Sequence, residues 1–232
     1  MKMNRPFVFI NVAMTADGKI DTIARRGATI SSQRDKERVD KLRAEADAVM
    51  VGGRTLLDED PKLTVKSEAL RAERVARGLS SNPVKVGIVS EVKLKTHSKF
   101  LYEGDAQCVI FTTHRTSKEE LTSLRSLEHV KVFVHEGERV DLRKMMHTLK
   151  ELGINRLMVE GGATLNFELI KLGLVDEVSA YVAPMIFGGE NAPSLAAGVG
   201  LDRGEAVPLK LISVENWDNG GVLLHYKVER FI

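Results

Sequence analysis

The apolar positions along the chain fall into short runs, and helical patterns separate these runs. FVFINVAM at residues 7–14 predicts a strand, and the Asp17-Gly18 pair that follows predicts a turn. Short runs rich in Val and Ile predict further strands at 48–51, 84–89, 108–111, 130–134, 156–160 and 177–184.

The segments between the strands have helical spacing. Ser32 is a candidate N-cap for a helix over 33–46, in which Val39, Leu42 and Ala46 share one face. Further helices are predicted at 67–77, 117–127, 141–153 and 164–172, with Gly78, Gly153 and Gly173 at or just beyond three of their ends. We expect the arginines of the 67–77 helix to form a solvated face; they are Arg71, Arg74 and Arg77.

Strands that alternate with helices predict an α/β fold with a mostly parallel sheet. The last segment, 209–228, instead predicts an antiparallel hairpin that turns at 218–221, so the sheet is expected to be mixed. No linker stands out, and we predict a single domain over residues 1–232. The long loop 188–208 is expected to serve function or dimer contact.

Composition narrows the class of protein. The chain has 232 residues, 43% of them apolar and 28% charged, as in ordinary globular proteins. With 34 basic and 32 acidic side chains it lacks the basic excess of a general nucleic-acid binder. Cys108 is the only cysteine, which excludes an intramolecular disulfide and fits a cytoplasmic protein. No run approaches the roughly 18 apolar residues of a membrane span, and we expect no membrane contact.

Two stretches share the layout strand, Gly-Gly, one residue, Thr, helical turn: AVMVGGRTLL at 48–57 and LMVEGGATLN at 157–166. The first peptide N–H groups of a helix attract phosphate oxygens, and glycine lets a diphosphate approach the main chain. A tight turn without a ligand is the alternative for either stretch alone, but the repetition favours a dinucleotide. Neither stretch fits G-x-G-x-x-G or the P-loop pattern.

Other reaction classes lack their signatures. There is no G-x-S-x-G, no H-E-x-x-H and no H-x-E…P-C-x-x-C deaminase motif. The six histidines show no metal-ligand spacing, so we predict no metal site and place most of them at the surface. Met145 and Met146 are expected in the core.

Four stretches stand in the same order and spacing as in the riboflavin-biosynthesis pyrimidine reductases: VAMTADGKI (12–20), LRAEADAVMVGGRTLLDEDPKLTV (42–65), NPVKVGIVS (82–90) and LMVEGGATLNFELIKLGLVDEVSAYVAPMIFGGENAPS (157–194). The chain most resembles the stand-alone archaeal members, and it is also similar to the reductase half of the bacterial deaminase-reductase. This resemblance implies a dihydrofolate-reductase-like fold and a homodimer. It further implies reduction of a ribosylamino group on a phosphorylated pyrimidine to ribitylamino, with NADPH as coenzyme and NADH left open.

The resemblance also implies site residues. Those that should contact the coenzyme are Thr55, Glu59, Ser90, Gly161, Gly162, Ala163 and Thr164. Those that should bind the substrate are Asn11, Arg43, Leu63 and Lys66. Lys19 and Glu160 are the catalytic candidates and should lie near the ribose, with Lys19 as the proton donor.

The chain departs from its relatives at three positions. Relatives often have Asp where this chain has Glu59, and many bacterial ones have Arg at Lys66 and Trp at Thr29. Lysine binds phosphate as a point charge, whereas arginine can form bidentate hydrogen bonds with it.

Alternative roles stay open for the residues and for the chain. Without the resemblance, Lys19 would be an exposed turn lysine and Glu160 a cap on the glycine turn. The chain itself could be a folate or pterin reductase of the same fold, or a non-catalytic NADP-binding protein. The basic pair Arg43 and Lys66 favours a sugar-phosphate substrate over a pterin.

Overall fold

The structure is a computed structural model that describes residues 4–95 and 97–229. The chain divides into two compact units, one built mainly of Val39–Met158, the other of Phe7–Arg38 and the residues from Val159 on. The prediction that residues 1–232 form one domain stays a prediction.

The first unit contains a parallel sheet in which the strands follow the order β5-β4-β3-β2-β6. Parallel pairing joins β2 to β3, β3 to β4 and β4 to β5. Every residue of β2 and β4 is buried, which is why both sequences are continuous apolar runs rather than alternating ones. The strands are β2 Ala48–Gly52, β3 Val84–Ile88, β4 Cys108–Thr113, β5 Val130–His135 and β6 Arg156–Val159, whose last residue belongs to the second unit.

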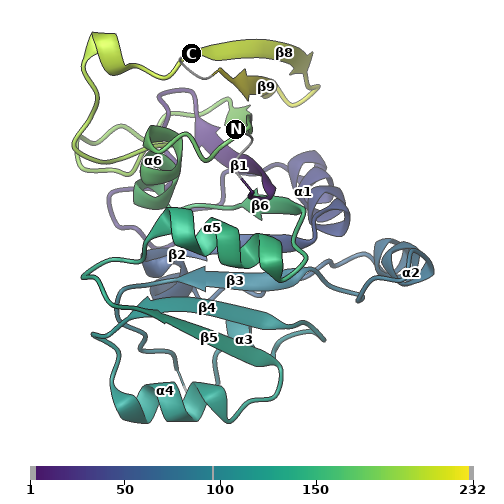
Figure 1. Cartoon of the computed structure of the whole chain (residues 1–232). Coiled ribbons are helices and arrows are strands. Elements are labelled where there is room, and N and C mark those ends of the chain that lie inside the picture. The colour runs from purple at the N-terminus through teal and green to yellow at the C-terminus, as the bar shows by residue number, and fades with distance from the viewer. Residues whose placement is uncertain (1–3, 96, 230–232) are drawn as a thin grey trace. The chain divides into compact units, whose positions relative to one another are not determined.

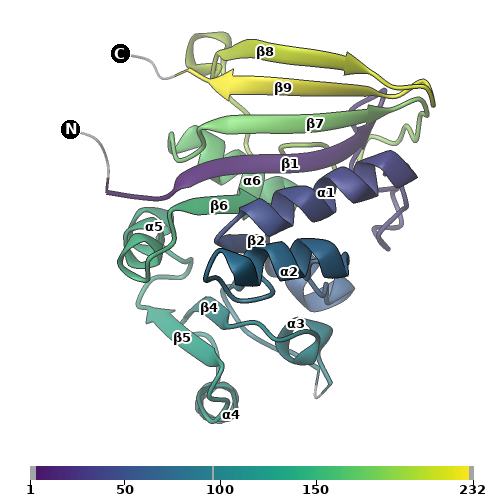
Figure 2. The ribbon, with the colours of Figure 1, turned by 90° about the vertical axis from the view of Figure 1, so that its right-hand side faces the viewer.

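Helices cover both faces of this sheet. Figures 1 and 2 show α5 and α3 on opposite sides of the strands. Ser67, Ser117 and Asp141 cap α2, α4 and α5 through their side-chain oxygens. The helices are α2 Glu68–Ala76, α3 Lys99–Tyr102, α4 Lys118–Arg125 and α5 Leu142–Glu151, and a π-helical turn η1 spans Thr55–Glu59.

The second unit contains strands in the order β1-β7-β9-β8. β1 (Phe7–Thr15) and β7 (Glu177–Ala183) run parallel, whereas β9 (Val222–Val228) is antiparallel to β7 and to β8 (Leu209–Asn216). The mixed sheet and its C-terminal hairpin are therefore confirmed.

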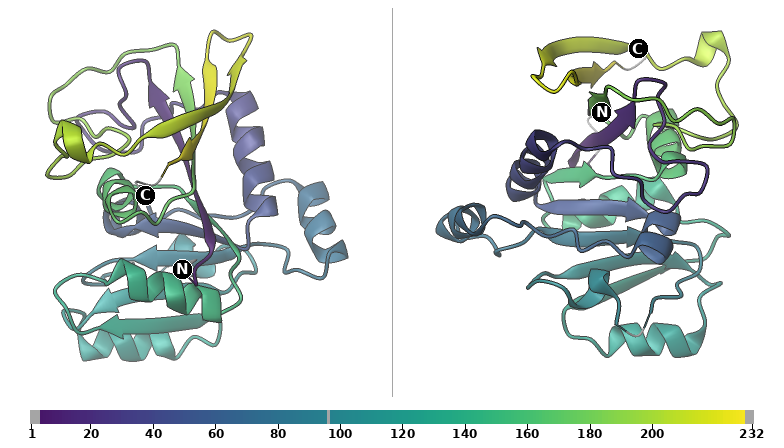
Figure 3. Two further views of the ribbon diagram at one scale, coloured as in Figure 1. Left: turned by 45° about the horizontal axis from the view of Figure 1, so that its top comes forward. Right: turned by 180° about the vertical axis from the view of Figure 1, so that it is seen from behind.

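The loop between β7 and β8 contains a short 3-10 turn, η2 (Arg203–Glu205), and passes α6 (Ala163–Lys171) in both views of Figure 3. Helix α1 (Gln33–Glu45) begins in the second unit and ends in the first. Its predicted N-cap is confirmed, because the Ser32 hydroxyl accepts a hydrogen bond from the Asp35 N–H at 3.2 Å.

The predicted strands and helices are confirmed, and Met145 and Met146 are buried as expected. Gly78, Gly153 and Gly173 all have positive φ, at 75°, 85° and 67°, as the end of a helix requires. The sequence did not predict the short helix α3.

The prediction that the arginines of α2 form a solvated face is wrong for Arg74. This side chain is 2% exposed, and its guanidinium donates to the carbonyl oxygens of Ala44 and Ala46 at 2.8 Å and of Ser80 at 2.9 Å. Arg74 therefore caps the C-terminal end of α1, where carbonyl groups lack partners within the helix. Burial lowers the pKa of this guanidinium from its usual value.

Candidate functional site

The predicted glycine turn lies in the second unit, directly before α6. Gly161 has φ +107°, a region that side-chain-bearing residues rarely adopt, and the Gly161-Gly162 peptide bond is cis. A Cβ added at Gly161 would meet no atom within 4 Å, so the main chain borders open space there. The turn thus has room beside the main chain of Gly161, which is itself buried, directly before the N-terminus of a helix.

Helix α6 begins with Gly162 at its N-cap position, and a glycine has no side chain with which to cap the helix. The first N–H groups of a helix have no partner inside the helix and carry partial positive charge. Thr164, in the first turn, is exposed. This end of α6 therefore has the properties of an anion-binding site, and the residues fit a diphosphate.

The second glycine pair has a different local structure. Gly52 ends β2, and Gly53 opens the helical turn that leads to Thr55 and Glu59. A Cβ added at Gly53 would lie 3.2 Å from the Cγ2 atom of Val89, so close packing by itself favours glycine here. A phosphate-binding role for this pair stays a prediction.

Lys19 lies on a tightly bonded turn after β1. The Thr15 hydroxyl donates to Asp17 at 2.5 Å and accepts from the Lys19 N–H at 3.0 Å. Asp17 also accepts from the Gly188 N–H at 2.8 Å. The hydrogen bond from Thr15, with help from the backbone N–H groups, lowers the pKa of Asp17, so this carboxylate stays ionised and holds the turn.

The Lys19 side chain is partly buried rather than fully exposed. Its ammonium donates to the Ala192 carbonyl oxygen at 3.3 Å, and its backbone forms an isolated antiparallel bridge with Ser194. Glu160, the other catalytic candidate, is also partly buried and directly precedes the glycine turn.

Asn11, a predicted substrate residue, is buried on β1 in a polar cluster. Its Oδ1 accepts from the Arg38 guanidinium at 2.7 Å, and the same guanidinium donates to Asp35 at 2.8 Å and to the Ser179 hydroxyl at 3.0 Å. Asp35 is fully buried, and its Oδ2 has no hydrogen-bond partner among the described residues. Asn11 thus supports the packing of α1 on the sheet, and its substrate role stays a prediction.

The other three substrate candidates come together in the first unit. Arg43 donates to the Thr64 carbonyl oxygen at 3.0 Å, which brings its guanidinium beside the segment that holds Leu63 and Lys66. Leu63 is buried with φ +52°, an uncommon conformation for a leucine, while the Lys66 side chain is exposed.

Sequence reasoning missed Asp40, which shapes this segment. Its carboxylate is 8% exposed and accepts from the backbone N–H groups of Lys66 at 2.6 Å and Ser67 at 2.8 Å. In the sequence Asp40 is a single acidic residue within a helical pattern, and nothing near it indicates that it bonds residues 66 and 67.

Glu59, a coenzyme candidate, ends the π-helical turn, and Asp60 fixes the chain beyond it. Asp60 is 7% exposed and accepts from the Ser98 hydroxyl at 2.6 Å and from the N–H groups of Lys99 and Phe100 at 2.8 and 3.0 Å. Burial opposes ionisation of this carboxyl, but the three hydrogen bonds outweigh it and lower the pKa of Asp60.

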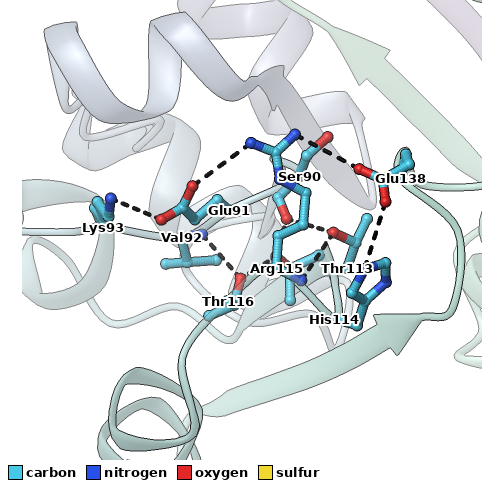
Figure 4. A network of polar contacts seen from close by, with 10 residues as sticks. Ser90, Glu91, Val92, Lys93, Thr113, His114, Arg115, Thr116 and Glu138 are labelled. Atoms are coloured by element: carbon cyan, nitrogen blue, oxygen red, sulfur yellow. Dashed lines mark hydrogen bonds and ion pairs between the residues drawn. The ribbon is translucent and has the colours of Figure 1, made fainter.

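Ser90, the remaining coenzyme candidate, follows the carboxyl end of β3 and lies among the polar contacts that Figure 4 shows. Its carbonyl oxygen accepts from the Thr113 hydroxyl at 2.6 Å. The Arg115 guanidinium lies 3.8 Å from the carboxylate of Glu91 and 4.0 Å from that of Glu138, and the Arg115 side chain is half-exposed. Ligands of open α/β sheets bind at the carboxyl ends of strands, which supports the prediction for Ser90 without testing it.

No group of three or more His, Cys, Asp or Glu is placed to hold a metal ion in residues 4–95 and 97–229. In the same ranges, no helix has the length and apolar character that crossing a membrane would require.

Comparison with known proteins gives consistent matches over most of the chain. The profile of the RibD C-terminal domain matches residues 6–223. The 2,5-diamino-6-ribosylamino-4(3H)-pyrimidinone 5′-phosphate reductase of Methanothermobacter thermautotrophicus is 41% identical, over 89% of this chain and 91% of that protein. The protein of the same name from Archaeoglobus fulgidus is 39% identical, over 84% and 87%.

Solved structures agree on the fold. A pyrimidine reductase-like protein from Corynebacterium diphtheriae superposes with a TM-score of 0.84 at 20% identity, covering 98% of this chain and 94% of that one. A dihydrofolate reductase from Enterococcus faecalis, solved with NADP(H), gives a TM-score of 0.51 at 12% identity and covers 97% of both chains. The predicted dihydrofolate-reductase-like fold is confirmed.

Proposed function

Since the chain belongs to the family of the RibD C-terminal domain, we propose that it is a pyrimidine reductase of riboflavin biosynthesis. It reduces the ribosylamino group of 2,5-diamino-6-ribosylamino-4(3H)-pyrimidinone 5′-phosphate to a ribitylamino group. The identity to two archaeal reductases over 84–89% of the chain carries this proposal. The family resemblance seen in the sequence is thereby confirmed.

NADPH is the proposed reductant, and the glycine turn is the proposed site of its diphosphate. The main chain beside open space at Gly161 and the first N–H groups of α6 would donate hydrogen bonds to phosphate oxygens. Thr164 would add a hydroxyl donor from the first turn. A bound reduced nicotinamide would supply a hydride to C1′ of the opened ribosyl group.

Lys19 is proposed to hold the proton that the ribose ring oxygen takes up when its bond to C1′ opens. The ammonium donates one hydrogen bond to the Ala192 carbonyl, which orients it, and its two further N–H groups would donate to the sugar. Glu160 is proposed to accept hydrogen bonds from ribose hydroxyl groups, which would keep the sugar in place while its ring opens.

The substrate's 5′-phosphate is proposed to bind Arg43 and Lys66. Arg43 is oriented by the Thr64 carbonyl, and the Lys66 backbone is held by Asp40. The guanidinium can bind phosphate through two parallel hydrogen bonds, whereas the lysine contributes a point charge. Leu63 and Asn11 complete the proposed substrate residues.

The proposed second copy in a homodimer would cover β8. All eight residues of this edge strand are exposed, although Leu209, Leu211, Ile212 and Val214 are apolar and 46–50% exposed. An exposed apolar edge strand pairs readily with another chain. Light scattering should therefore show a dimer, and Ile212→Lys should shift it toward monomer; a monomeric wild type would remove this part of the proposal.

The proposed reaction is tested by following NADPH oxidation with the ribosylaminopyrimidine phosphate and, in parallel, with dihydrofolate. Oxidation with the first substrate alone supports the proposal. Oxidation with dihydrofolate alone would make the chain a folate reductase, and tight NADPH binding without turnover would make it a non-catalytic binder. Lys19→Met should retain NADPH affinity and lose turnover; unchanged turnover would remove Lys19 from the chemistry.

A further inference from the structure

The segment 192–198, in the loop after β7, is bonded to the turn that carries Lys19. Ser194 forms a β-bridge with Lys19, and the Ile20 N–H donates to the Pro193 carbonyl at 2.9 Å. The Lys19 ammonium donates to the Ala192 carbonyl of the same segment. The position of Lys19 therefore depends on the position of this segment.

The other end of the segment is bonded to α6, directly after the glycine turn. The Asn166 Nδ2 donates to the Leu195 carbonyl at 2.8 Å, and the Ala197 N–H donates to the Ala163 carbonyl at 3.1 Å. Gly198 lies against the Phe167 ring so closely that a Cβ there would be 2.2 Å from a ring carbon. The segment thus joins the Lys19 turn to the glycine turn within one unit.

Asn166 is an unusual residue for its place. Its side chain is fully buried, and its Oδ1 has no hydrogen-bond partner among the described residues. Burying an amide with an unbonded oxygen opposes folding, and leucine, of similar size, would avoid this cost. The bond to Leu195 also fixes the amide's orientation, because only the nitrogen can donate to a carbonyl.

We propose that Asn166 is a positioning residue: by holding the Leu195 carbonyl it sets where segment 192–198 places Lys19 relative to the glycine turn. The proposal rests on the proposed function, in which Lys19 protonates the sugar and the glycine turn binds the coenzyme. Misplacement of a catalytic group by about 1 Å can lower turnover roughly 100-fold. Asn166 would therefore affect turnover without touching either ligand.

A double-mutant cycle tests the catalytic part. Asn166→Leu should lower kcat by roughly 100-fold and leave the Kd for NADPH nearly unchanged. In a Lys19→Met background the same substitution should lower kcat no further, because the group that it misplaces is gone. A loss in the double variant equal to the product of the single losses would overturn the proposal.

A conservative variant adds a pH readout. In Asn166→Asp, a protonated carboxyl can donate to the Leu195 carbonyl and an ionised one cannot. Its kcat relative to wild type should therefore rise as the pH is lowered, whereas the ratio for Asn166→Leu should stay flat. Parallel curves for the two variants would contradict the positioning role.

Hydrogen exchange tests the geometry independently of any reaction. Asn166→Leu should speed exchange of the Ile20 amide about tenfold or more, since this amide is bonded to the segment. Asn155→Leu is the matched control, because its exposed amide bonds residues close to it in the chain: it accepts from the Lys150 ammonium and donates to the Gly153 carbonyl. Unchanged Ile20 exchange in a folded Asn166 variant would overturn the proposal, whereas a wild type with no reductase activity would instead remove the proposed function.

Discussion

Replacement of Gly161 by alanine separates the backbone requirement of the glycine turn from its proposed contact with the coenzyme. At φ +107° an alanine costs on the order of 1–3 kcal/mol of stability. A steric clash does not add to this loss of stability, because the new Cβ would meet no atom within 4 Å. The methyl group would instead stand in the space proposed for the diphosphate. Loss of one charge-assisted hydrogen bond there weakens binding by about 1.5–3 kcal/mol, which is about 10- to 150-fold in Kd.

Gly173→Ala is the matched control, because Gly173 also has positive φ (67°) and open space at its Cβ, but lies at the opposite end of α6. Urea unfolding should show that both variants lose stability, the control by about 1–2 kcal/mol. A fluorescence titration with NADPH should show weaker binding for Gly161→Ala alone. Equal NADPH affinity in the two variants would refute the reasoning, because the turn would then not contact the coenzyme.

Three further predictions concern the first unit. Arg43→Ala should raise KM for the phosphorylated pyrimidine about tenfold or more and leave KM for NADPH unchanged; equal effects on both would contradict its role. Arg74→Met should lower the unfolding free energy by about 2–4 kcal/mol in urea titrations, because buried carbonyl groups lose their donor, whereas Arg125→Met on an exposed surface should change it little. Asp60→Asn should be destabilising at neutral pH, because the pKa of Asp60 is lowered in the folded protein. The ionised carboxylate therefore stabilises the fold above a pH of about 4, and this stabilisation is lost as the pH falls. Urea midpoints against pH should show the gap to wild type narrowing in acid, and a constant gap would be inconsistent with this assignment.

The elements could be predicted because their signals are local. Ser117 caps α4 by accepting from the Glu120 N–H, three residues away, and Ser67 caps α2 in the same way. The apolar runs of β2 and β4 likewise reflect burial that follows from a parallel sheet between helices. Such patterns act within one turn or one strand, so they can be read without knowing the rest of the fold.

What the sequence did not reveal depends on distant partners. Arg74 has the charge and spacing of a solvated helix face, but its partner carbonyls lie 28 and 30 residues earlier in the chain. Asp60 bonds residues 38–40 positions away. Asn166 reaches Leu195 at a separation of 29. None of these pairings follows from periodicity or from local turn chemistry.

The glycine turns show the same limit within the candidate site. The two pairs have one sequence layout, yet Gly161 has positive φ beside open space whereas Gly53 packs against Val89. The resemblance to a family placed coenzyme residues at both, and only the structure distinguishes their local surroundings.

A crystal structure of the chain with NADPH tests the central claim most directly. The account predicts a phosphate oxygen of the coenzyme within about 3 Å of the backbone nitrogen of Ala163 or Thr164. A coenzyme whose diphosphate is bound elsewhere, with no contact to residues 160–164, would contradict it.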